Sequence, residues 1–285
     1  MSATVDGLLE EAARDPAEGI EARREAQILL GHALGVSRAW IAAHGEEQVY
    51  SPAASVFRDL VGRRRTGEPV AYLVGKREFY GLDFRVTPDV LIPRADTETL
   101  VDAALEKLDR HASHNVLDLG TGSGCVAITI AHERPASRVT AVDTSPAALD
   151  VARGNAAAIG ARVEFVLGSW FESLEANQFD LIVSNPPYVA AGDPHLQQGD
   201  LRFEPATALI AGEDGLNDIR CIVAGAREHL LLGGWLLFEH GYDQADVSRD
   251  LLLDAGFGDV QSRADIAGVA RVAGGRLLTP KSPSR

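Results

Sequence analysis

The feature that most limits the fold is the alternation of short apolar runs with longer helical segments that begins at Asn115. Predicted strands cover residues 115–119, 138–142, 162–167, 179–184 and 235–239, and predicted helices cover residues 125–133, 145–158, 219–231 and 247–255. Strands that alternate with helices form a parallel sheet with helices on both faces. The pattern therefore predicts an α/β fold with a doubly wound, Rossmann-like sheet. Two last strands, 257–262 and 269–277, have no helix between them and predict an antiparallel edge.

The first 70 residues have a helical pattern instead. We predict one helix over 20–34 that Gly35 ends, and another over 38–43 that Ser37 caps. A third begins at Ser51-Pro52, with Ser51 as its cap, and ends after Arg65. These segments predict a small helical bundle at 1–70, suited to packing, to covering a cleft or to recognising a partner.

Residues 71–93 form a predicted connector between the bundle and the α/β domain. Extended runs at 70–74, 78–80 and 82–86, broken by glycine, predict a β-hairpin there. The α/β domain then covers 94–280 and opens with a helix that Asp96 caps. A disordered tail is predicted at 281–285.

Charge and composition limit the partners. A formal net charge of -14 and a pI near 5.0 argue against a broad phosphate-binding surface, so we expect no direct nucleic-acid contact. No apolar run approaches the length of a membrane span, and the first residues lack the apolar centre of a signal peptide. Cys125 and Cys221 have no metal-ligand spacing and are expected to be reduced, which favours the cytoplasm. The eight histidines are scattered along the sequence, so we predict no metal site.

A glycine-rich loop follows the first predicted strand, Asp118-Leu119-Gly120-Thr121-Gly122-Ser123-Gly124. Glycine permits a tight turn and lets a ligand approach the backbone at the start of a helix. The spacing differs from the dinucleotide fingerprint, because Cys125 stands where its third glycine belongs. The next strand leads to Asp143, whose carboxylate can accept hydrogen bonds from both ribose hydroxyls of an adenosine group. The loop and Asp143 together favour S-adenosylmethionine; a purely structural turn is the alternative.

Trp170 follows the third predicted strand and enters the same rim. Its ring is interpreted equally well as a platform for adenine or as a tryptophan at the edge of the core.

Asn185-Pro186-Pro187-Tyr188 follows the strand at 179–184, so it lies at the edge where open α/β sheets bind ligands. The two prolines fix the backbone and remove two N–H donors. The turn then presents oxygen acceptors beside an aromatic ring, a receptor for a planar group with N–H donors. An ordinary proline-rich turn is the alternative.

These residues suggest how an amide nitrogen could be methylated. If the Asn185 side-chain oxygen and the Pro186 carbonyl each accept one amide N–H, the nitrogen is held with its lone pair toward the methyl donor. The same dipoles stabilise the positive charge that develops on nitrogen. Tyr188 packs against the amide plane, and the product loses its proton without a dedicated base.

Beyond these motifs, the chain resembles the bacterial release factor glutamine N5-methyltransferases, the PrmC/HemK family. Segments that carry the resemblance are Arg77-Glu78-Phe79-Tyr80-Gly81, Leu91-Ile92-Pro93-Arg94, Gly168-Ser169-Trp170-Phe171, Asp193-Pro194-His195-Leu196, Arg202-Phe203-Glu204-Pro205 and Phe238-Glu239-His240-Gly241. One departure is Ala95, where the family usually has proline, and Arg94 is expected only at the rim of the site.

The resemblance implies a class I methyltransferase fold and a set of site residues. Gly120–Gly124, Asp143, Trp170 and Asn185 would contact S-adenosylmethionine, and Asn185, Pro186, Pro187 and Tyr188 would hold the substrate glutamine. That glutamine belongs to the Gly-Gly-Gln motif of class-1 release factors, which the helical domain would help to dock. Asn-Pro-Pro-Tyr is shared with adenine-N6 DNA and RNA methyltransferases, which remain one alternative. A non-catalytic S-adenosylmethionine-binding scaffold is another.

Overall fold

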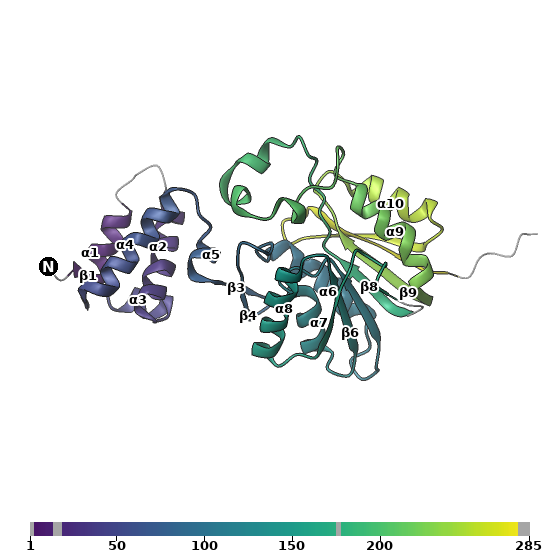
Figure 1. The fold of residues 1–285 in the computed structure, drawn as a ribbon, viewed down its shortest axis with the longest axis horizontal. Coiled ribbons are helices and arrows are strands. Elements are labelled where there is room, and N and C mark those ends of the chain that lie inside the picture. The colour runs from purple at the N-terminus through teal and green to yellow at the C-terminus, as the bar shows by residue number, and fades with distance from the viewer. Residues whose placement is uncertain (1–2, 14–18, 175–177, 279–285) are drawn as a thin grey trace, which may run out of the picture. The chain divides into compact units, whose positions relative to one another are not determined.

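The computed structural model describes residues 3–13, 19–174 and 178–278, and the tail at 281–285 lies outside this range. The chain divides into two compact units (Figure 1). Unit 1 contains Met1–Lys76 together with Gln197–Phe203, and unit 2 contains Arg77–Leu196 together with Glu204–Arg285. A segment from the middle of the chain therefore belongs to the same unit as the N-terminal helices.

The described residues of unit 2 form a seven-stranded sheet of order β10-β11-β9-β8-β5-β6-β7. The strands are β5 (Asn115–Leu119), β6 (Arg138–Asp143), β7 (Val163–Leu167), β8 (Phe179–Ser184), β9 (Leu230–Glu239), β10 (Gly258–Ala264) and β11 (Ala270–Arg276). The five strands β5 to β9 are parallel, whereas β11 is antiparallel to both β9 and β10. The predicted doubly wound sheet and its antiparallel edge are thus confirmed.

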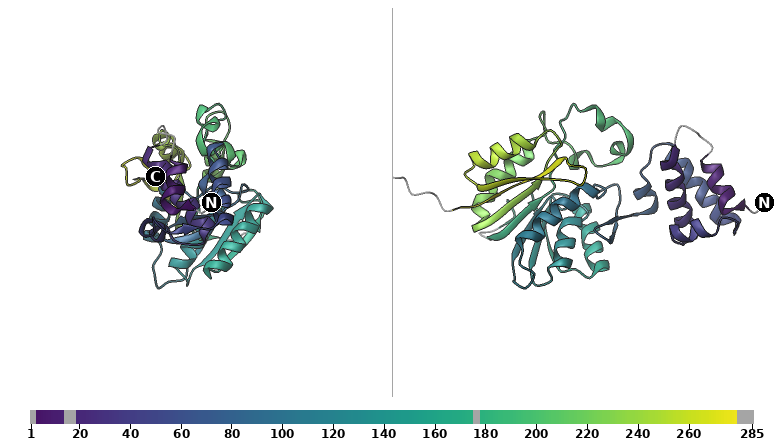
Figure 2. Two further views of the ribbon diagram at one scale, coloured as in Figure 1. Left: turned by 90° about the vertical axis from the view of Figure 1, so that its left-hand side faces the viewer. Right: turned by 180° about the vertical axis from the view of Figure 1, so that it is seen from behind.

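Helices cover both faces of this sheet. One face carries α6 (Glu98–Lys107), α7 (Cys125–Glu133) and α8 (Pro146–Ile159), and the other carries α9 (Asn217–His229) and α10 (Ala245–Asp254). In Figure 2 the teal helices α7 and α8 and the yellow-green helices α9 and α10 lie on opposite sides of the strands. Successive residues of β5 point to opposite faces, so Val116 packs in the first core and Leu117 in the second.

The order in which the chain adds strands to the sheet reverses between β5 and β8. From β5 the chain proceeds to β6 and β7 on one side, and then returns to β8 and β9 on the other. At such a switch point the loops after neighbouring strands separate and leave a crevice at their carboxyl ends. The loops after β5, β6, β7 and β8 are the ones that bear the predicted site residues.

Unit 1 is helical. Its helices are α1 (Val5–Ala12), α2 (Gly19–Leu34), α3 (Arg38–Ala43), α4 (Ser51–Arg65) and α5 (Val70–Val74), and β1 (Ala3–Thr4) pairs with β2 (Gln48–Val49). Leu8, Leu30 and Phe57 are buried in its core. Ser37 caps α3 as predicted, because its hydroxyl accepts a hydrogen bond from the Trp40 N–H.

In the sequence, a hairpin of β3 (Lys76–Phe79) and β4 (Leu82–Arg85) follows the helices of unit 1 and precedes the strands of the sheet. The extended run predicted at 70–74 is wrong, since these residues form α5. Pro69 precedes that helix, and Gly75, with φ of 73°, ends it in the left-handed conformation. These two residues delimit a short helix that apolar, β-branched composition alone does not reveal.

Two predicted caps are also wrong. Ser51 is the first residue of α4 rather than its cap, and Tyr50 occupies the cap position without a side-chain hydrogen bond. Asp96 lies inside the 3-10 helix η1 (Ala95–Thr97) that precedes α6, and its carboxylate pairs with Arg271 at 3.0 Å. Further 3-10 turns, η2 (Pro194–Gln197), η3 (Gly199–Phe203) and η4 (Ala206–Ala208), follow the Asn-Pro-Pro-Tyr turn.

Candidate functional site

A cavity of about 510 Å³ opens at the carboxyl ends of β5, β6, β7 and β8. Its lining brings together the glycine loop, Asp143, Trp170 and Asn185, which the sequence places in four separate segments. Of the predicted site residues, Gly120, Thr121, Gly122, Ser123, Asp143, Trp170, Asn185 and Pro187 line it. Gly124, Pro186 and Tyr188 do not line it; Gly124 and Pro186 are buried, and Tyr188 is half-buried.

The glycine loop has its shape because its glycines adopt conformations that other residues avoid. Gly120, Gly122 and Gly124 have φ of 72°, 56° and 82°. Gly124 also permits close packing, since a Cβ there would lie 2.6 Å from Ile128 Cδ1. The Gly120 and Thr121 N–H groups both donate to Val142 O, at 2.9 and 3.0 Å, so the loop folds back over the end of β6.

Asp143 is fixed at the end of β6 by two backbone donors. Its Oδ2 accepts from the Gly122 N–H at 2.8 Å, and its Oδ1 accepts from the Ser145 N–H at 2.9 Å. A carboxylate has about four acceptor positions, so both oxygens retain capacity for ligand hydroxyls. Ser145 in turn caps α8, and the glycine loop, the acid and the helix start form one connected structure.

Asp118 is a cavity-lining acid that was not singled out from the sequence. It is 1% exposed, and burial raises its pKa to about 7, although hydrogen bonds from the Thr121 hydroxyl and the Ala127 N–H favour the charged form. Beside the cavity, such a carboxylate suits a cationic ligand group. A polar residue inside the otherwise apolar strand 115–119 is the signal that could have identified it.

Trp170 lies against the glycine loop. Its ring is 3.5 Å from the position that a Cβ of Gly120 would occupy, and its φ of 46° is unusual for a residue with a side chain. The half-buried indole forms one wall of the cavity, next to the glycine loop.

Asn185 follows β8, and a hydrogen bond to another segment of the chain holds its side-chain amide. Its Nδ2 donates to the Thr97 Oγ1 at 3.1 Å. The preceding residue, Ser184, donates from its hydroxyl to Leu119 O at 2.7 Å, which joins β8 to the start of the glycine loop. Asn185 is therefore positioned by contacts to two other segments and still lines the cavity.

Tyr188 is directed away from the cavity toward a buried acid. Its hydroxyl donates to Glu239 Oε1 at 3.1 Å, and its carbonyl accepts from the Gln244 side chain at 3.0 Å. Burial raises the pKa of Glu239 to about 7, although hydrogen bonds from Thr97 and Tyr188 favour its charged form. Neither Thr97 nor Glu239 was singled out from the sequence. An acid at the carboxyl end of a buried strand was the available signal for Glu239.

Arg94, predicted at the rim, does line the cavity. Its guanidinium pairs with the buried carboxylate of Glu204, which also accepts from the Ile92 N–H at 3.0 Å. Glu204 thereby joins residues 92–94 to the segment that continues through Pro205 and Thr207, both of which line the cavity.

The described ranges contain no group of three or more His, Cys, Asp or Glu side chains that could hold a metal ion. In the same ranges no helix is both long and apolar enough to cross a membrane.

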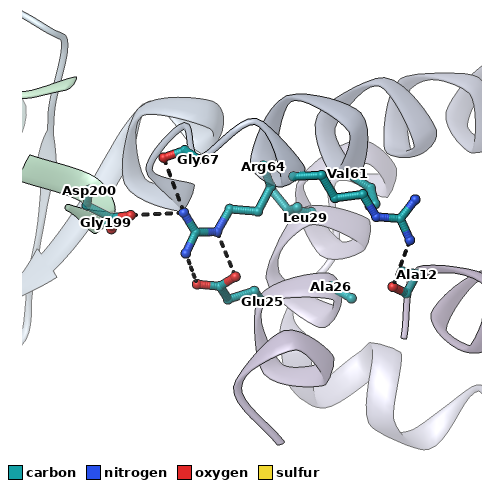
Figure 3. A pocket seen from close by; sticks show the side chains of 10 residues that line it. Ala12, Glu25, Ala26, Leu29, Val61, Arg64, Gly67, Gly199 and Asp200 are labelled. Carbon is teal, nitrogen blue, oxygen red and sulfur yellow. Dashed lines mark hydrogen bonds and ion pairs between the residues drawn. The ribbon is translucent and has the colours of Figure 1, made fainter. Parts of the chain in front are cut away.

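Unit 1 has a cavity of its own, of about 330 Å³ (Figure 3). Arg64 stands at its edge, with two hydrogen bonds to the Glu25 carboxylate at 2.7 and 2.9 Å and one to Asp200 at 2.9 Å. Arg65 donates to the carbonyl of Ala12. The charged groups at this cavity thus bond to one another, and Arg64 connects Asp200 to Glu25 of α2 and to its own helix α4.

Two family models match the chain. The PrmC N-terminal domain matches residues 8–75, and the Methyltransferase small domain matches residues 96–211.

Curated relatives match over almost the whole length. A release factor glutamine methyltransferase from Bordetella pertussis is 51% identical over 271 residues, which cover 95% of this chain and 99% of the relative. One from Burkholderia pseudomallei is 52% identical over 260 residues, which cover 89% and 91%.

Among solved structures, a 16S rRNA N2 G1207 methyltransferase from T. thermophilus, in complex with AdoMet and guanosine, matches with a TM-score of 0.53. It is 20% identical, and the match covers 70% of this chain and 49% of that one. At this identity the likeness concerns the fold of the sheet and its helices.

Proposed function

This chain belongs to the release factor glutamine methyltransferase family, and we propose that its cavity transfers a methyl group from S-adenosylmethionine to the side-chain nitrogen of a release-factor glutamine. The acceptor is the glutamine of the Gly-Gly-Gln motif of class-1 release factors, and the products are N5-methylglutamine and S-adenosylhomocysteine. The observation that carries the assignment to particular atoms is the position of Asn185, whose amide is anchored at one end while the residue lines the cavity.

The cavity lining fits S-adenosylmethionine. A volume of about 510 Å³ lies within the usual range for small-molecule sites. Asp143, already oriented by two N–H groups, is suited to the ribose hydroxyls, and the Trp170 ring to the adenine face. Asp118 is suited to the cationic methionine end. When bound, this cofactor supplies an electrophilic methyl carbon on a sulfonium, so its leaving group needs no acid.

The chain's own contribution is to orient a poor nucleophile. An amide nitrogen shares its lone pair with the carbonyl, so it reacts only when it is held in the correct direction. Asn185 Oδ1 accepts one N–H of the acceptor amide and stabilises charge that develops on nitrogen. Pro186 is buried and does not line the cavity, so acceptance of the other N–H by its carbonyl remains a prediction. Tyr188 stiffens the turn from behind through its hydrogen bond to Glu239, and a role for its ring against the amide plane remains a prediction.

Unit 1 is proposed to dock the release factor. Support comes from the match of residues 8–75 to the PrmC N-terminal domain and from the lack of any predicted chemistry in its helices. With the pI near 5.0, we expect a protein partner rather than a nucleic acid.

The test compares acceptors. Purified enzyme and S-adenosylmethionine are incubated with a class-1 release factor, with the same factor carrying alanine in place of the Gly-Gly-Gln glutamine, and with adenine-containing DNA and RNA. We expect labelling of the first alone, and about a 100-fold or greater loss of turnover in Asn185→Ala. Labelling of the nucleic acids instead would establish the adenine-N6 alternative, and cofactor binding without transfer would establish the scaffold.

A further inference from the structure

We infer that Thr97 is a positioning residue which decides which end of the Asn185 amide faces the acceptor glutamine, and that Glu239 directs the Thr97 hydroxyl. The inference rests on the proposed role of Asn185. Three groups from distant parts of the chain carry it: the end of η1, the turn after β8 and the carboxyl end of β9.

Two hydrogen bonds connect these groups in pairs, Asn185 with Thr97 and Tyr188 with Glu239. Thr97 and Glu239 are each 1% exposed. Asn185 Nδ2 donates to Thr97 Oγ1 at 3.1 Å, and Tyr188 donates to Glu239 Oε1 at 3.1 Å. Thr97 is near enough to the Glu239 carboxylate for its hydroxyl to favour the charged form, and the buried Glu239 Oε2 has no hydrogen-bond partner among the described residues, so it is free to accept from that hydroxyl. In such surroundings a polar atom without a partner is costly, so the direction of each bond matters.

The hydroxyl of Thr97 has one proton to give. An ionised carboxylate can only accept, so the hydroxyl donates to Glu239 and offers its lone pairs to Asn185. Only the NH₂ end of the Asn185 amide can satisfy those lone pairs. Because oxygen and nitrogen lie on opposite sides of the planar amide, Oδ1 is then directed away from Thr97, toward the cavity.

This direction is what the reaction needs. An acceptor glutamine presents N–H groups, which Oδ1 can accept, whereas the flipped amide would present its own N–H donors to them. The flipped state would repel the acceptor nitrogen or turn its lone pair away from the methyl. Thr97 lines the cavity with Asn185, and we assign its effect on the rate of transfer to its hydrogen bond with Asn185 rather than to a contact with substrate.

The first experiment compares Thr97→Val, which removes the hydroxyl at nearly constant shape, with Thr97→Ser, which keeps it. We expect Thr97→Val to lower kcat about 10- to 100-fold while KM for release factor stays within about 3-fold. Thr97→Ser should recover kcat to within about 3-fold of the wild type. Calorimetry with S-adenosylhomocysteine should give a Kd for Thr97→Val within about 3-fold of the wild type, because the cofactor contacts of the loop are untouched.

Thr129→Val is the matched control. Thr129 is fully buried on α7, and within the described part of the chain its Oγ1 has no hydrogen-bond partner. The same chemical change there should leave kcat unaltered.

A second variant, Glu239→Gln, tests the direction of the bonds. A glutamine can donate to Thr97, which turns the threonine proton toward Asn185 and favours the flipped amide. Assays at about pH 8.5, above the pKa of about 7 that burial gives Glu239, keep the wild-type carboxylate ionised. We expect a loss of kcat similar to that of Thr97→Val, and no further loss in the double variant, because both changes act through one amide.

The outcomes separate this inference from the proposed function. Wild-type kcat in Thr97→Val, an equal loss in Thr97→Ser, or additive losses in the double variant would each overturn the role of Thr97 while leaving methyl transfer intact. If Thr97→Val is poorly folded, Thr97→Ser and Glu239→Gln still decide. Undiminished transfer by Asn185→Ala, or none by the wild type, would refute the proposed function instead.

Discussion

Asp118 is a carboxylic acid placed where a charge is costly. Burial raises its pKa from the ordinary 3.8 to about 7, so the folded protein holds a proton that the unfolded chain has already lost. The stabilising contribution of that proton is complete below the unfolded pKa and disappears as the pH rises through about 7.

The substitution Asp118→Asn tests whether the titration of Asp118 makes the stability of the protein depend on pH. Asparagine keeps an acceptor for the Thr121 hydroxyl but has no charge to bury. Between about pH 5 and pH 8 the stability of the wild type relative to Asp118→Asn should fall by about 2–3 kcal/mol. Urea unfolding of both proteins at several pH values, without cofactor, measures this difference. A difference that does not change with pH would show that Asp118 titrates normally.

Site residues differed in how far the sequence could reveal them. The glycine loop and Asp143 were predictable, because a strand, a glycine-rich turn and a following helix are local features. For Glu239 the only local signal was an acid at the end of a buried strand, and for Thr97 there was none, since the contacts of both residues depend on the tertiary fold. The hydrogen bond from Asn185 to Thr97, for instance, joins residues 88 positions apart.

At the scale of elements, Asn155 joins three of them. From the middle of α8 its Nδ2 donates to Arg85 O at 3.0 Å and to Ser123 O at 2.9 Å, and its Oδ1 accepts from the Arg85 N–H at 2.7 Å. The hairpin strand β4 and the glycine loop are thereby attached to one helix.

Asn155→Ala should therefore lower the stability of unit 2 by about 2–3 kcal/mol, because it leaves buried backbone groups unpaired. It should also weaken S-adenosylhomocysteine binding, which calorimetry measures. The control is Asp150→Ala on the same helix, where an exposed pair with Arg153 is lost and a change below about 0.5 kcal/mol is expected. Equal effects of the two substitutions would contradict the role of Asn155.

Element prediction succeeded where two signals agreed. In unit 2, the apolar runs end at or just before glycine or proline residues. The predicted and observed limits of β5, α7 and β8 are therefore the same. At residues 70–74 the signals conflict: β-branched composition indicated a strand, whereas Pro69 and Gly75 delimit a helix. The strands β1 and β2 are each two residues long and pair with each other in unit 1. No local sequence pattern predicts such short strands.

At the scale of the whole molecule, the segment Gln197–Phe203 leaves the α/β part of the chain and belongs to unit 1. Arg64 holds it through Asp200, as Figure 3 shows. The residue that follows the segment, Glu204, holds Arg94 at the rim of the unit 2 cavity. A short stretch of chain thus carries one anchor in each unit.

Arg64→Ala should release the segment without unfolding the protein. Because Arg64 is partly exposed, we expect a stability loss of about 1 kcal/mol or less, with amide exchange across residues 197–203 faster by about 10-fold. Arg58→Ala, which removes an exposed pair with Glu11 from the same helix, is the control and should leave that exchange unchanged. Hydrogen-exchange mass spectrometry compares them, and unaltered exchange in Arg64→Ala would show that other contacts hold the segment.

The central claim is that a turn of oxygen acceptors at the end of β8 aims a glutamine side-chain nitrogen at a methyl donor. Tandem mass spectrometry of a class-1 release factor, after one round of treatment with enzyme and S-adenosylmethionine, tests it most directly. We predict a single added methyl group on the side-chain amide of the Gly-Gly-Gln glutamine. A methyl on any other residue, or an unmodified factor under conditions where the cofactor is bound, would contradict the claim.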